Sequence, residues 1–389
     1  MPSPTDPYLP AHDITGPDDA PVVVLGSSLG TDRHMWDAQV RLLQRRYRVV
    51  RYELRGHGRS GAPAVGATRT TIADLGADVV RLMDHLGIAR AHHVGLSIGG
   101  MVALWLAEHH PDRVGRLAVV CSAAHAPSEE SWRARAATVR AQGMAAIVDA
   151  VTARWFTDTY DDEASRARLR ETFLAVEPEG YAQCCEAIAG MDLRPHLSAV
   201  AGPVLVVAGR QDTALPPALA EEVAAGIRAG GADVRYESVE DAAHIAAVQQ
   251  PATVTRLVLD HLDADRPGHA TGMRVRREVL GDAHVDRAQE ATTTLNADFQ
   301  DFITRYAWGD VWSRPGLDRR TRSAITLAVL MTLGHDGEFA MHVRAALRNG
   351  LTVDEIREVL LHVGIYSGVP VANHAYALAT EVLRDEGLI

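Results

Sequence analysis

Lysine is absent from this chain. None of the 389 residues is a lysine, so all 39 basic residues are arginines. This absence excludes a lysine Schiff base, pyridoxal-phosphate chemistry anchored on a lysine, and the lysine of a phosphate-binding P-loop. Genomic base composition is sufficient to account for it, but any chemistry in this protein has to be carried by other side chains.

Cysteine, long apolar runs and excess positive charge are also scarce. The three cysteines, Cys121, Cys184 and Cys185, lack the spacing of a disulfide framework, which predicts reduced thiols in a cytoplasmic protein. No apolar run approaches the ~18 residues of a membrane-spanning helix, and the N-terminus lacks the pattern of a signal peptide. The formal net charge of −11 argues against nucleic acid and anionic membranes as partners.

Short apolar runs alternate with helical patterns from Pro21 to about Leu262. This alternation predicts a mostly parallel sheet wrapped by helices. Between about residues 126 and 197 the strand pattern vanishes, and helical patterns over 131–142, 145–155 and 164–176 predict an inserted helical cap. The predicted strands are 22–25, 48–52, 92–94, 117–121, 204–208 and 234–238.

The rest of the chain has a different character. Residues 263–272 are polar and contain proline and glycine, which is typical of a linker between a domain over 1–262 and a second domain. Residues 273–389 contain no period-two run, which predicts a separate all-α domain. Within it, Thr321–Leu333 is apolar on nearly every side and predicts a buried helix. The sequence Thr352-Val-Asp-Glu355 predicts a capping box at the start of a helix.

The pentapeptide Gly95-Leu-Ser-Ile-Gly99 follows a predicted strand and precedes a small, apolar run. Glycines at these positions permit a sharp strand-to-helix turn, which exposes the Ser97 hydroxyl above the sheet at the positive end of a helix. Taken alone, the motif is equally a serine in a glycine-rich turn. As a nucleophile, Ser97 needs a base and a carboxylate that orients the base.

Asp212 and His244 supply that pair in the expected chain order of nucleophile, acid and histidine. Asp212 follows the predicted strand 204–208, and His244 follows the last predicted strand, so both belong at the carboxyl edge of the sheet, where such sheets place their sites. A helix N-cap is the alternative role for Asp212, and a solvated loop residue is the alternative for His244. Asp241 is a weaker candidate for the acid.

A tetrahedral intermediate on Ser97 needs preorganised hydrogen-bond donors for its oxyanion. The backbone N–H of Ile98, directly after the serine, is one candidate. The other is expected from the loop Gly26-Ser-Ser-Leu-Gly30 after the first predicted strand, namely the N–H of Leu29.

Residues 21–262 resemble the α/β-hydrolase family, and more narrowly the 3-oxoadipate enol-lactone hydrolases of aromatic catabolism. Glu53 and Ser27 stand where this family would be expected to have aspartate and asparagine. The motifs that carry the resemblance are Ser27-Ser-Leu-Gly-Thr31, Met35-Trp-Asp37, Arg51-Tyr-Glu-Leu-Arg-Gly-His-Gly58, Gly95-Leu-Ser-Ile-Gly-Gly-Met101 and Gly209-Arg-Gln-Asp212.

Residues 275–383 resemble the 4-carboxymuconolactone decarboxylases. The motifs that carry this resemblance are Trp308-Gly-Asp-Val-Trp-Ser-Arg-Pro-Gly-Leu-Asp318, Thr321-Arg-Ser323, Gly334-His-Asp-Gly-Glu338 with His342, Asn349-Gly350, and Tyr366-Ser-Gly-Val-Pro370. The superfamily also includes peroxidase-like proteins with two cysteines in this region, but here other residues fill both cysteine positions. Thiol redox chemistry is therefore not available at this site.

The resemblance implies a cofactor-free decarboxylation in which His342 donates a proton, poised near neutral pH, and Glu338 orients it. The two residues are four apart and share a helix face, so a surface ion pair is the alternative. A metal site formed by His335, Glu338 and His342 is another alternative. Arg322 and Arg314 are candidates for clamping carboxylates, although exposed, salt-bridged arginines are common.

The two resemblances together imply one bifunctional enzyme without cofactors or metal. It decarboxylates 4-carboxymuconolactone and then hydrolyses the resulting enol-lactone to 3-oxoadipate, so its partners are small lactone carboxylates. Homo-oligomerisation through the helical domain is also expected. Two alternatives stay open: a general esterase or haloperoxidase-like hydrolase on the same triad, and a helical domain that serves only for oligomerisation.

Overall fold

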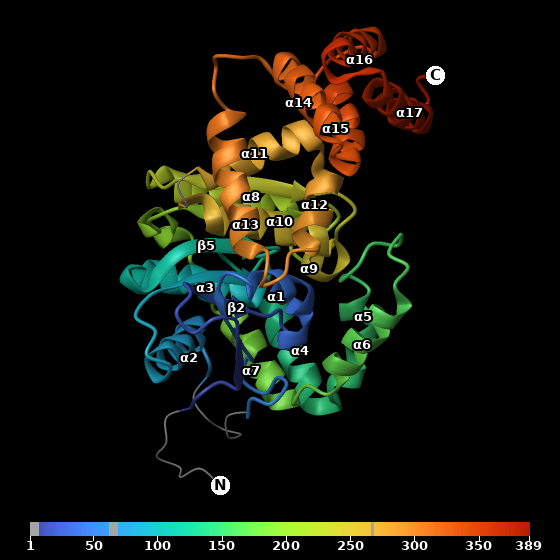
Figure 1. Ribbon diagram of the computed structural model, residues 1–389. Coiled ribbons are helices and arrows are strands. Elements are labelled where there is room, and N and C mark those ends of the chain that lie inside the picture. Colours follow the sequence, from blue (N-terminus) through green and yellow to red (C-terminus); the bar gives the residue numbers. More distant parts are fainter. Residues whose placement is uncertain (1–7, 62–68, 266–267) are drawn as a thin grey trace. The chain divides into compact units, whose positions relative to one another are not determined.

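The computed structural model describes residues 8–61, 69–265 and 268–389. The chain divides into two compact units, Met1–Leu262 and Asp263–Ile389, which Figure 1 colours from blue to yellow and from yellow to red. The first unit combines a sheet with helices, and the described part of the second is helical. This confirms the predicted fold class of an α/β-hydrolase domain followed by an all-α domain.

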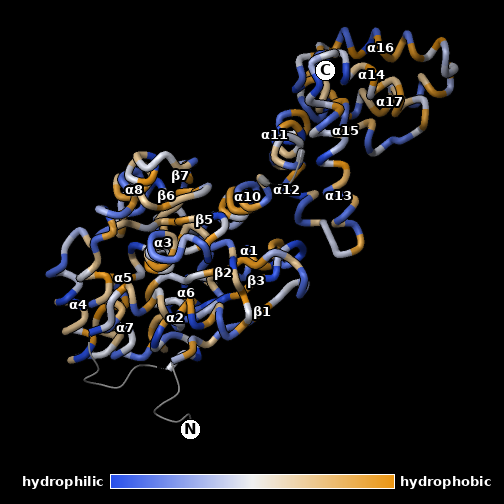
Figure 2. The backbone as a smooth tube through the Cα atoms, turned by 90° about the vertical axis from the view of Figure 1, so that its left-hand side faces the viewer, coloured by the Kyte–Doolittle hydropathy of each residue, from blue (hydrophilic) through white to orange (hydrophobic). Residues whose placement is uncertain are grey.

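A sheet of seven strands forms the centre of the described part of the first unit. The strand order is β1-β3-β2-β4-β5-β6-β7, and every pair is parallel except β1 with β3. Figure 2 shows hydrophobic residues along β5 and β6, which are buried on both faces as parallel strands require. The strands are β1 His12–Thr15, β2 Val22–Gly26, β3 Arg48–Tyr52, β4 Ala91–Leu96, β5 Val114–Val120, β6 Val204–Gly209 and β7 Val234–Val239.

The strand order reverses direction at β2, because β3 lies on one side of it and β4 on the other. Since crossover connections are right-handed, this reversal places α1 on one face of the sheet and α2, α3 and α8 on the other. It also opens a crevice at the carboxyl ends of β2 and β4, where open α/β sheets bind ligands. The helices are α1 Asp37–Leu43, α2 Ile72–His85, α3 Ile98–His109, α8 Pro217–Ala229, α9 Ala246–Gln249 and α10 Pro251–Leu262, with short 3-10 helices at Arg33–Trp36, Pro111–Arg113 and Arg194–Ala199.

A helical cap is inserted between β5 and β6, in the region where the strand pattern vanishes from the sequence (Figure 1). The side chain of Arg140 joins its first and last helices through ion pairs of 2.8 Å to Glu179 and 2.6 Å to Glu186. The cap consists of α4 Glu129–Gln142, a 3-10 turn at Met144–Ala146, α5 Val148–Thr152, α6 Glu163–Leu174 and α7 Pro178–Ala189.

The second unit packs its helices around a core that includes Leu327, Phe339, Val343 and Leu360. Thr352 and Glu355 form the predicted capping box at the start of α16. The helices are a 3-10 turn at Asp263–Asp265, α11 His269–Leu280, α12 Asp282–Glu290, α13 Ala297–Ile303, a π-helical segment Thr304–Val311, α14 Arg319–Leu333, α15 Asp336–Arg348, α16 Val353–Ser367 and α17 Val369–Asp385.

The linker expected over residues 263–272 is shorter in the structure. The helix α11 already begins at His269, whose side chain is buried. A side chain at Gly272 would approach the backbone oxygen of Thr304 to 1.9 Å, so this glycine permits close packing of α11 on the π-helical segment. Arg266 and Pro267, in the middle of the expected linker, lie outside the described residues.

The expectation that Thr321–Leu333 is a buried helix is wrong for the single chain. The helix is present as α14, but Ile325, Val329 and Leu333 are 49 %, 49 % and 61 % exposed. One face of α14 packs into the core through Leu327 and Met331, while Ile325, Val329 and Leu333 stay exposed among the described residues. Burial in the core of this unit therefore explains only part of the apolar pattern of α14.

Candidate active sites

Ser97 lies in the sharp turn between β4 and α3. Its backbone has φ 56° and ψ −121°, an unfavourable conformation for a residue with a side chain. Close packing explains the flanking glycines: a Cβ at Gly95 would lie 2.2 Å from the Gly99 oxygen, and one at Gly99 would lie 2.3 Å from the Gly26 oxygen. Ser122 Oγ donates to the Ser97 carbonyl at 2.7 Å, which fixes the turn.

Asp212 and His244 meet at the carboxyl edge of the sheet. The Asp212 Oδ2 atom lies 2.8 Å from His244 Nδ1, and both side chains are buried. The other carboxylate oxygen of Asp212 accepts the backbone N–H groups of Ala214 at 2.8 Å and Leu215 at 2.9 Å. The aspartate is therefore held on both oxygens. Asp241, the rival candidate, is exposed.

The two expected oxyanion donors belong to the α3 N-terminus and to the loop after β2. Ile98 is the first residue of α3, and Leu29 lines the same pocket as Ser97 and His244. The buried His57 positions the Leu29 loop, because its Nε2 accepts the Gly30 N–H at 3.0 Å while its Nδ1 lies 2.9 Å from the Arg55 carbonyl. Burial lowers the His57 pKa to about 4, so His57 is neutral and can accept this bond at pH 7.

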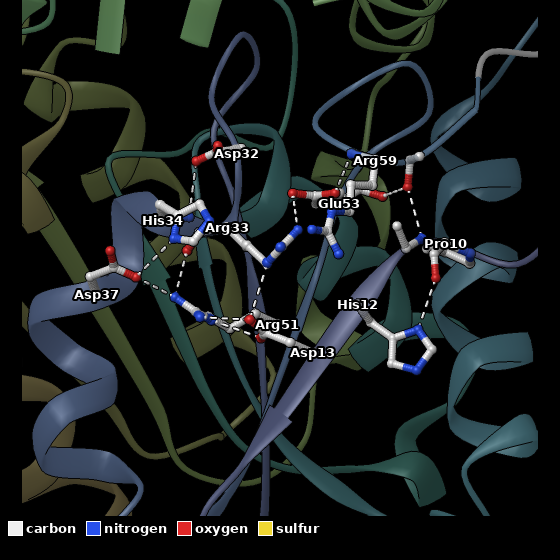
Figure 3. Close-up of polar contacts among 12 residues, drawn as sticks. Pro10, His12, Asp13, Asp32, Arg33, His34, Asp37, Arg51, Glu53 and Arg59 are labelled. Atoms are coloured by element: carbon white, nitrogen blue, oxygen red, sulfur yellow. Dashed lines mark hydrogen bonds and ion pairs between the residues drawn. The ribbon is translucent and has the colours of Figure 1, made fainter. Parts of the chain in front are cut away.

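A partly buried ion network lies next to the same loop. Figure 3 shows Arg33, just after the loop, between Asp13 of β1 and Glu53 at the end of β3, at 3.1 and 2.6 Å. The second oxygen of Glu53 accepts the Arg59 backbone N–H at 2.6 Å. Glu53, which stands where aspartate was expected, thus joins the loop to the turn that carries His57.

Residues of the cap line the pocket that contains Ser97 and His244. Its walls include Trp132 and Arg135 from α4, and Arg154 and Trp155 after α5. Both arginines are partly buried, and burial, together with the charge of Arg135, lowers the pKa of Arg154. The free volume is only about 40 Å³. Two cations that line a small pocket with Ser97 favour an anionic ligand.

In the second unit, Glu338 and His342 both lie on α15, as expected. His342 is buried, its Nδ1 has no hydrogen-bond partner within the described residues, and the Trp312 ring lies 6.3 Å from its ring. Burial, reinforced by His284, lowers the His342 pKa to about 4. His342 is therefore neutral at pH 7 in the free chain, and the expectation of a near-neutral pKa is wrong.

The remaining candidates of the second unit have local roles. Arg322 donates to the carbonyls of Leu317 at 3.1 Å and Arg314 at 2.9 Å, and so closes the loop before α14. The Arg314 side chain is exposed. His335 is the exposed residue before α15, and no cluster of three His, Cys, Asp or Glu side chains suited to a metal is found in the described parts of the chain.

Sequence reasoning missed His57, Arg135 and Arg154. His57 lies in the Arg51–Gly58 motif, and its structural role could have been predicted, because a buried histidine in a tight turn needs a backbone partner. The cap arginines carry no local signal: they are two of 39 arginines, and only the folding of α4 and α5 over the sheet brings them to the serine.

Comparison with known proteins gives a consistent result for each unit. A family model described as the alpha/beta hydrolase fold matches residues 21–251, and a model of the carboxymuconolactone decarboxylase family matches residues 297–381. No helix among the residues described has the length and apolarity to cross a membrane.

Individual relatives match over nearly their whole lengths. The first unit is 38 % identical to 3-oxoadipate enol-lactonase 2 of Acinetobacter baylyi, over 62 % of this chain and 89 % of that protein. It superposes on the crystal structure of the enol-lactonase from Burkholderia xenovorans with a TM-score of 0.61 and 42 % identity, over 65 % of this chain and 95 % of that one. The second unit is 50 % identical to 4-carboxymuconolactone decarboxylase of A. baylyi, over 32 % of this chain and 92 % of that protein.

Proposed function

The chain belongs to the α/β-hydrolase fold family through its first unit and to the carboxymuconolactone decarboxylase family through its second, and from this premise we propose that it catalyses two consecutive reactions. The second unit decarboxylates 4-carboxymuconolactone to 3-oxoadipate enol-lactone. The first unit hydrolyses this enol-lactone to 3-oxoadipate. The observation that carries the proposal is the match of the two units to two enzymes whose product and substrate coincide.

In the hydrolase reaction, Ser97 Oγ attacks the lactone carbonyl while His244 takes its proton. Asp212 orients His244 through the 2.8 Å bond to Nδ1 and stabilises the imidazolium that forms. The N–H groups of Leu29 and Ile98 stabilise the oxyanion. The ring C–O bond then breaks and leaves an acyl-enzyme and an enol, which becomes the ketone. Water activated by His244 releases 3-oxoadipate, and ketone formation makes the step effectively irreversible.

The carboxylate of the enol-lactone fits the cationic wall of the cap. Arg135 and Arg154 line the pocket that contains Ser97 and His244, and a guanidinium binds a carboxylate through two parallel hydrogen bonds. The pocket of about 40 Å³ is too small for a five-membered lactone with a carboxymethyl group. We therefore infer that the cap side chains move outward when the substrate enters.

In the decarboxylase reaction, the substrate is its own electron sink. The C–C bond to the departing carboxylate breaks, its electron pair forms a ring double bond, and the existing double bond shifts its pair to the lactone carbonyl. A proton then adds to the carbon next to this carbonyl. We assign the proton to His342 and its orientation to Glu338. A bound dianion would raise the His342 pKa above its free value, because negative charge favours the imidazolium.

The helical unit also has the surface of an oligomer subunit. Of the seventeen large hydrophobic residues that are exposed in the described chain, fifteen lie in Asp263–Ile389, among them Ile365 at 77 % and Tyr366 at 80 %. Exposed apolar surface of this extent is unusual for a monomer. We propose that the second unit associates with copies of itself. The cytoplasmic location expected from the cysteines, all three free and buried, stays a prediction.

A coupled assay tests the proposed function. When 4-carboxymuconolactone is supplied to the full chain, chromatography should show a transient enol-lactone followed by 3-oxoadipate at rates well above the uncatalysed ones. Turnover of a neutral nitrophenyl ester in the same preparation measures the alternative, a general esterase. Rapid ester hydrolysis without any enol-lactone hydrolysis, or an unchanged starting lactone, would overturn the proposal.

A further inference from the structure

A basic groove of about 670 Å³ lies between the end of α11, helix α12 and one side of α15 in the second unit. Four arginines and one histidine line it, against a single aspartate, Asp282. The basic residues are Arg277, His284, Arg287, Arg344 and Arg348. No expectation from the sequence, and no residue discussed so far as a substrate clamp, lies in this groove.

Two of the four arginines already form ion pairs with carboxylates. Arg277 forms ion pairs with Asp282 at 3.0 Å and Asp286 at 2.8 Å. Arg344 forms ion pairs with the two acidic residues at the end of α17, Asp385 and Glu386, both at 3.0 Å. Arg277 thus joins α11 to α12, Arg344 joins α15 to the end of α17, and both have little charge to offer a ligand.

Arg287 and Arg348 have no acidic partner within the described residues. Arg287 is exposed on α12. Arg348, on α15, reaches the Val279 carbonyl at 3.4 Å. Its guanidinium lies against Gly281, where a Cβ would come within 2.9 Å of its central carbon. Each of the two helices thus presents one uncompensated guanidinium to the groove.

The groove shares helix α15 with the proposed decarboxylase residues. Gly337 and Met341 line it, and Glu338 and His342 are the next residues along the same helix. His284 of the groove wall is close enough to influence the titration of His342, and its own pKa is lowered by burial and by Arg276, Arg287 and Arg348. The basic residues that line the groove therefore act electrostatically on both His284 and, through it, His342.

We propose that this groove binds a vicinal dicarboxylate, with Arg287 and Arg348 each holding one carboxylate. The proposal rests on the proposed function: 4-carboxymuconolactone carries a carboxylate and a carboxymethyl group on one ring carbon, and these atoms form a succinate skeleton. One carboxylate leaves as CO2 and the other stays, so a site with two separate cations can retain the product's carboxylate throughout. Charge-assisted bonds to arginine are strong enough to fix this orientation.

Succinate is the probe, because it has both carboxylates but no electron sink. In the full chain, succinate should inhibit decarboxylation competitively, while propionate, a monocarboxylate, should inhibit far more weakly. Arg287→Gln and Arg348→Gln should each raise both the KM for the lactone and the inhibition constant of succinate by roughly tenfold or more, the loss typical of one charged hydrogen bond. The effect on kcat should be smaller.

Arg384→Gln is the matched control, since Arg384 is an exposed arginine of α17 outside the groove. It should leave both constants unchanged. If the KM for the lactone and the inhibition constant of succinate are unchanged in the Arg287 and Arg348 variants, the groove does not bind the substrate. The same follows if succinate does not inhibit decarboxylation. In both cases the proposed function of the chain would stand. If the wild type decarboxylates nothing, the proposed function fails; calorimetric succinate binding that is lost in the double variant would then still support the groove, and no binding would overturn it.

Discussion

Two aspartates near His244 differ in what they contact. Asp212 bonds to His244 Nδ1 and is held by two backbone N–H groups, whereas Asp241 is exposed. Asp212→Asn should reduce kcat for enol-lactone hydrolysis by ~10³–10⁴-fold, because the amide favours the wrong imidazole tautomer. Asp241→Asn is the matched control and should retain nearly full activity. The reverse pattern would transfer the orienting role to Asp241.

The buried carboxyl group of Glu108, near the end of α3, should make the stability of the protein depend on pH. Its side chain is 1 % exposed, its oxygens have no hydrogen-bond partner in the described chain, and His109 Nδ1 lies 3.9 Å away. Burial raises the Glu108 pKa from 4.5 to about 8. An acid whose pKa is raised by folding stabilises the fold at low pH, and this contribution is lost as the pH rises from about 4.5 through about 8.

Glu108→Gln removes this titration. We expect the melting temperature of the variant to exceed that of the wild type increasingly as the pH rises toward 8, with the smallest difference near pH 4.5. Glu130→Gln, a change at an exposed carboxylate of α4, should follow the wild-type curve. Parallel melting curves for wild type and Glu108→Gln across this range would show that Glu108 is ionised in the folded protein.

At the scale of elements, helix α4 of the cap carries Arg135, which we propose to bind the substrate carboxylate. Arg135 lines the pocket with Ser97. Arg135→Gln should lower kcat/KM for the enol-lactone by roughly tenfold or more, the loss of one charged hydrogen bond. It should leave hydrolysis of a neutral nitrophenyl ester nearly unchanged. Arg133→Gln, on the same helix and paired with Glu129 at 2.5 Å on the surface, is the control.

A loss of both activities in the Arg135 variant, with Arg133→Gln intact, would give Arg135 a structural role in closing the cap instead. Equal kcat/KM values for the enol-lactone in wild type and Arg135→Gln would leave the carboxylate to Arg154 or to the solvent. Steady-state kinetics on the two substrates distinguish these results.

Some helices and strands can be predicted from the sequence more readily than others. The inner strands are valine-rich and buried, so their periodicity predicts six of the seven described strands. The edge strand β1, His12–Thr15, was missed because its residues are partly exposed and mostly polar. Ser97, Asp212 and His244 could be proposed as a triad from the sequence because each follows a recognisable strand. The cap and groove arginines could not be predicted in this way, because tertiary packing alone brings them together.

At the scale of the whole molecule, the proposed self-association can be tested by changing exposed apolar residues of the second unit. Ile365→Ser with Tyr366→Ser changes two of the most exposed hydrophobic residues, both at the end of α16. We expect the wild-type chain to sediment as an oligomer and this double variant to dissociate or weaken. Leu174→Ser, at a 41 % exposed residue of the first unit, should not change the oligomeric state. A monomeric wild type would exclude association through this unit.

The central claim is that one chain carries two independent, consecutive active sites. Its most direct test is complementation with 4-carboxymuconolactone as the sole substrate. Ser97→Ala should form enol-lactone but convert it at least ~10³-fold more slowly, because the nucleophile is gone. His342→Ala should leave the starting lactone largely unconverted, since a general acid typically contributes ~10²–10⁴-fold.

Mixing the two variants should restore 3-oxoadipate formation, because the intermediate made by one protein is hydrolysed by the other. A mixture that accumulates enol-lactone, or a Ser97→Ala protein that makes 3-oxoadipate at the wild-type rate, would contradict the assignment of the two reactions to two separate sites.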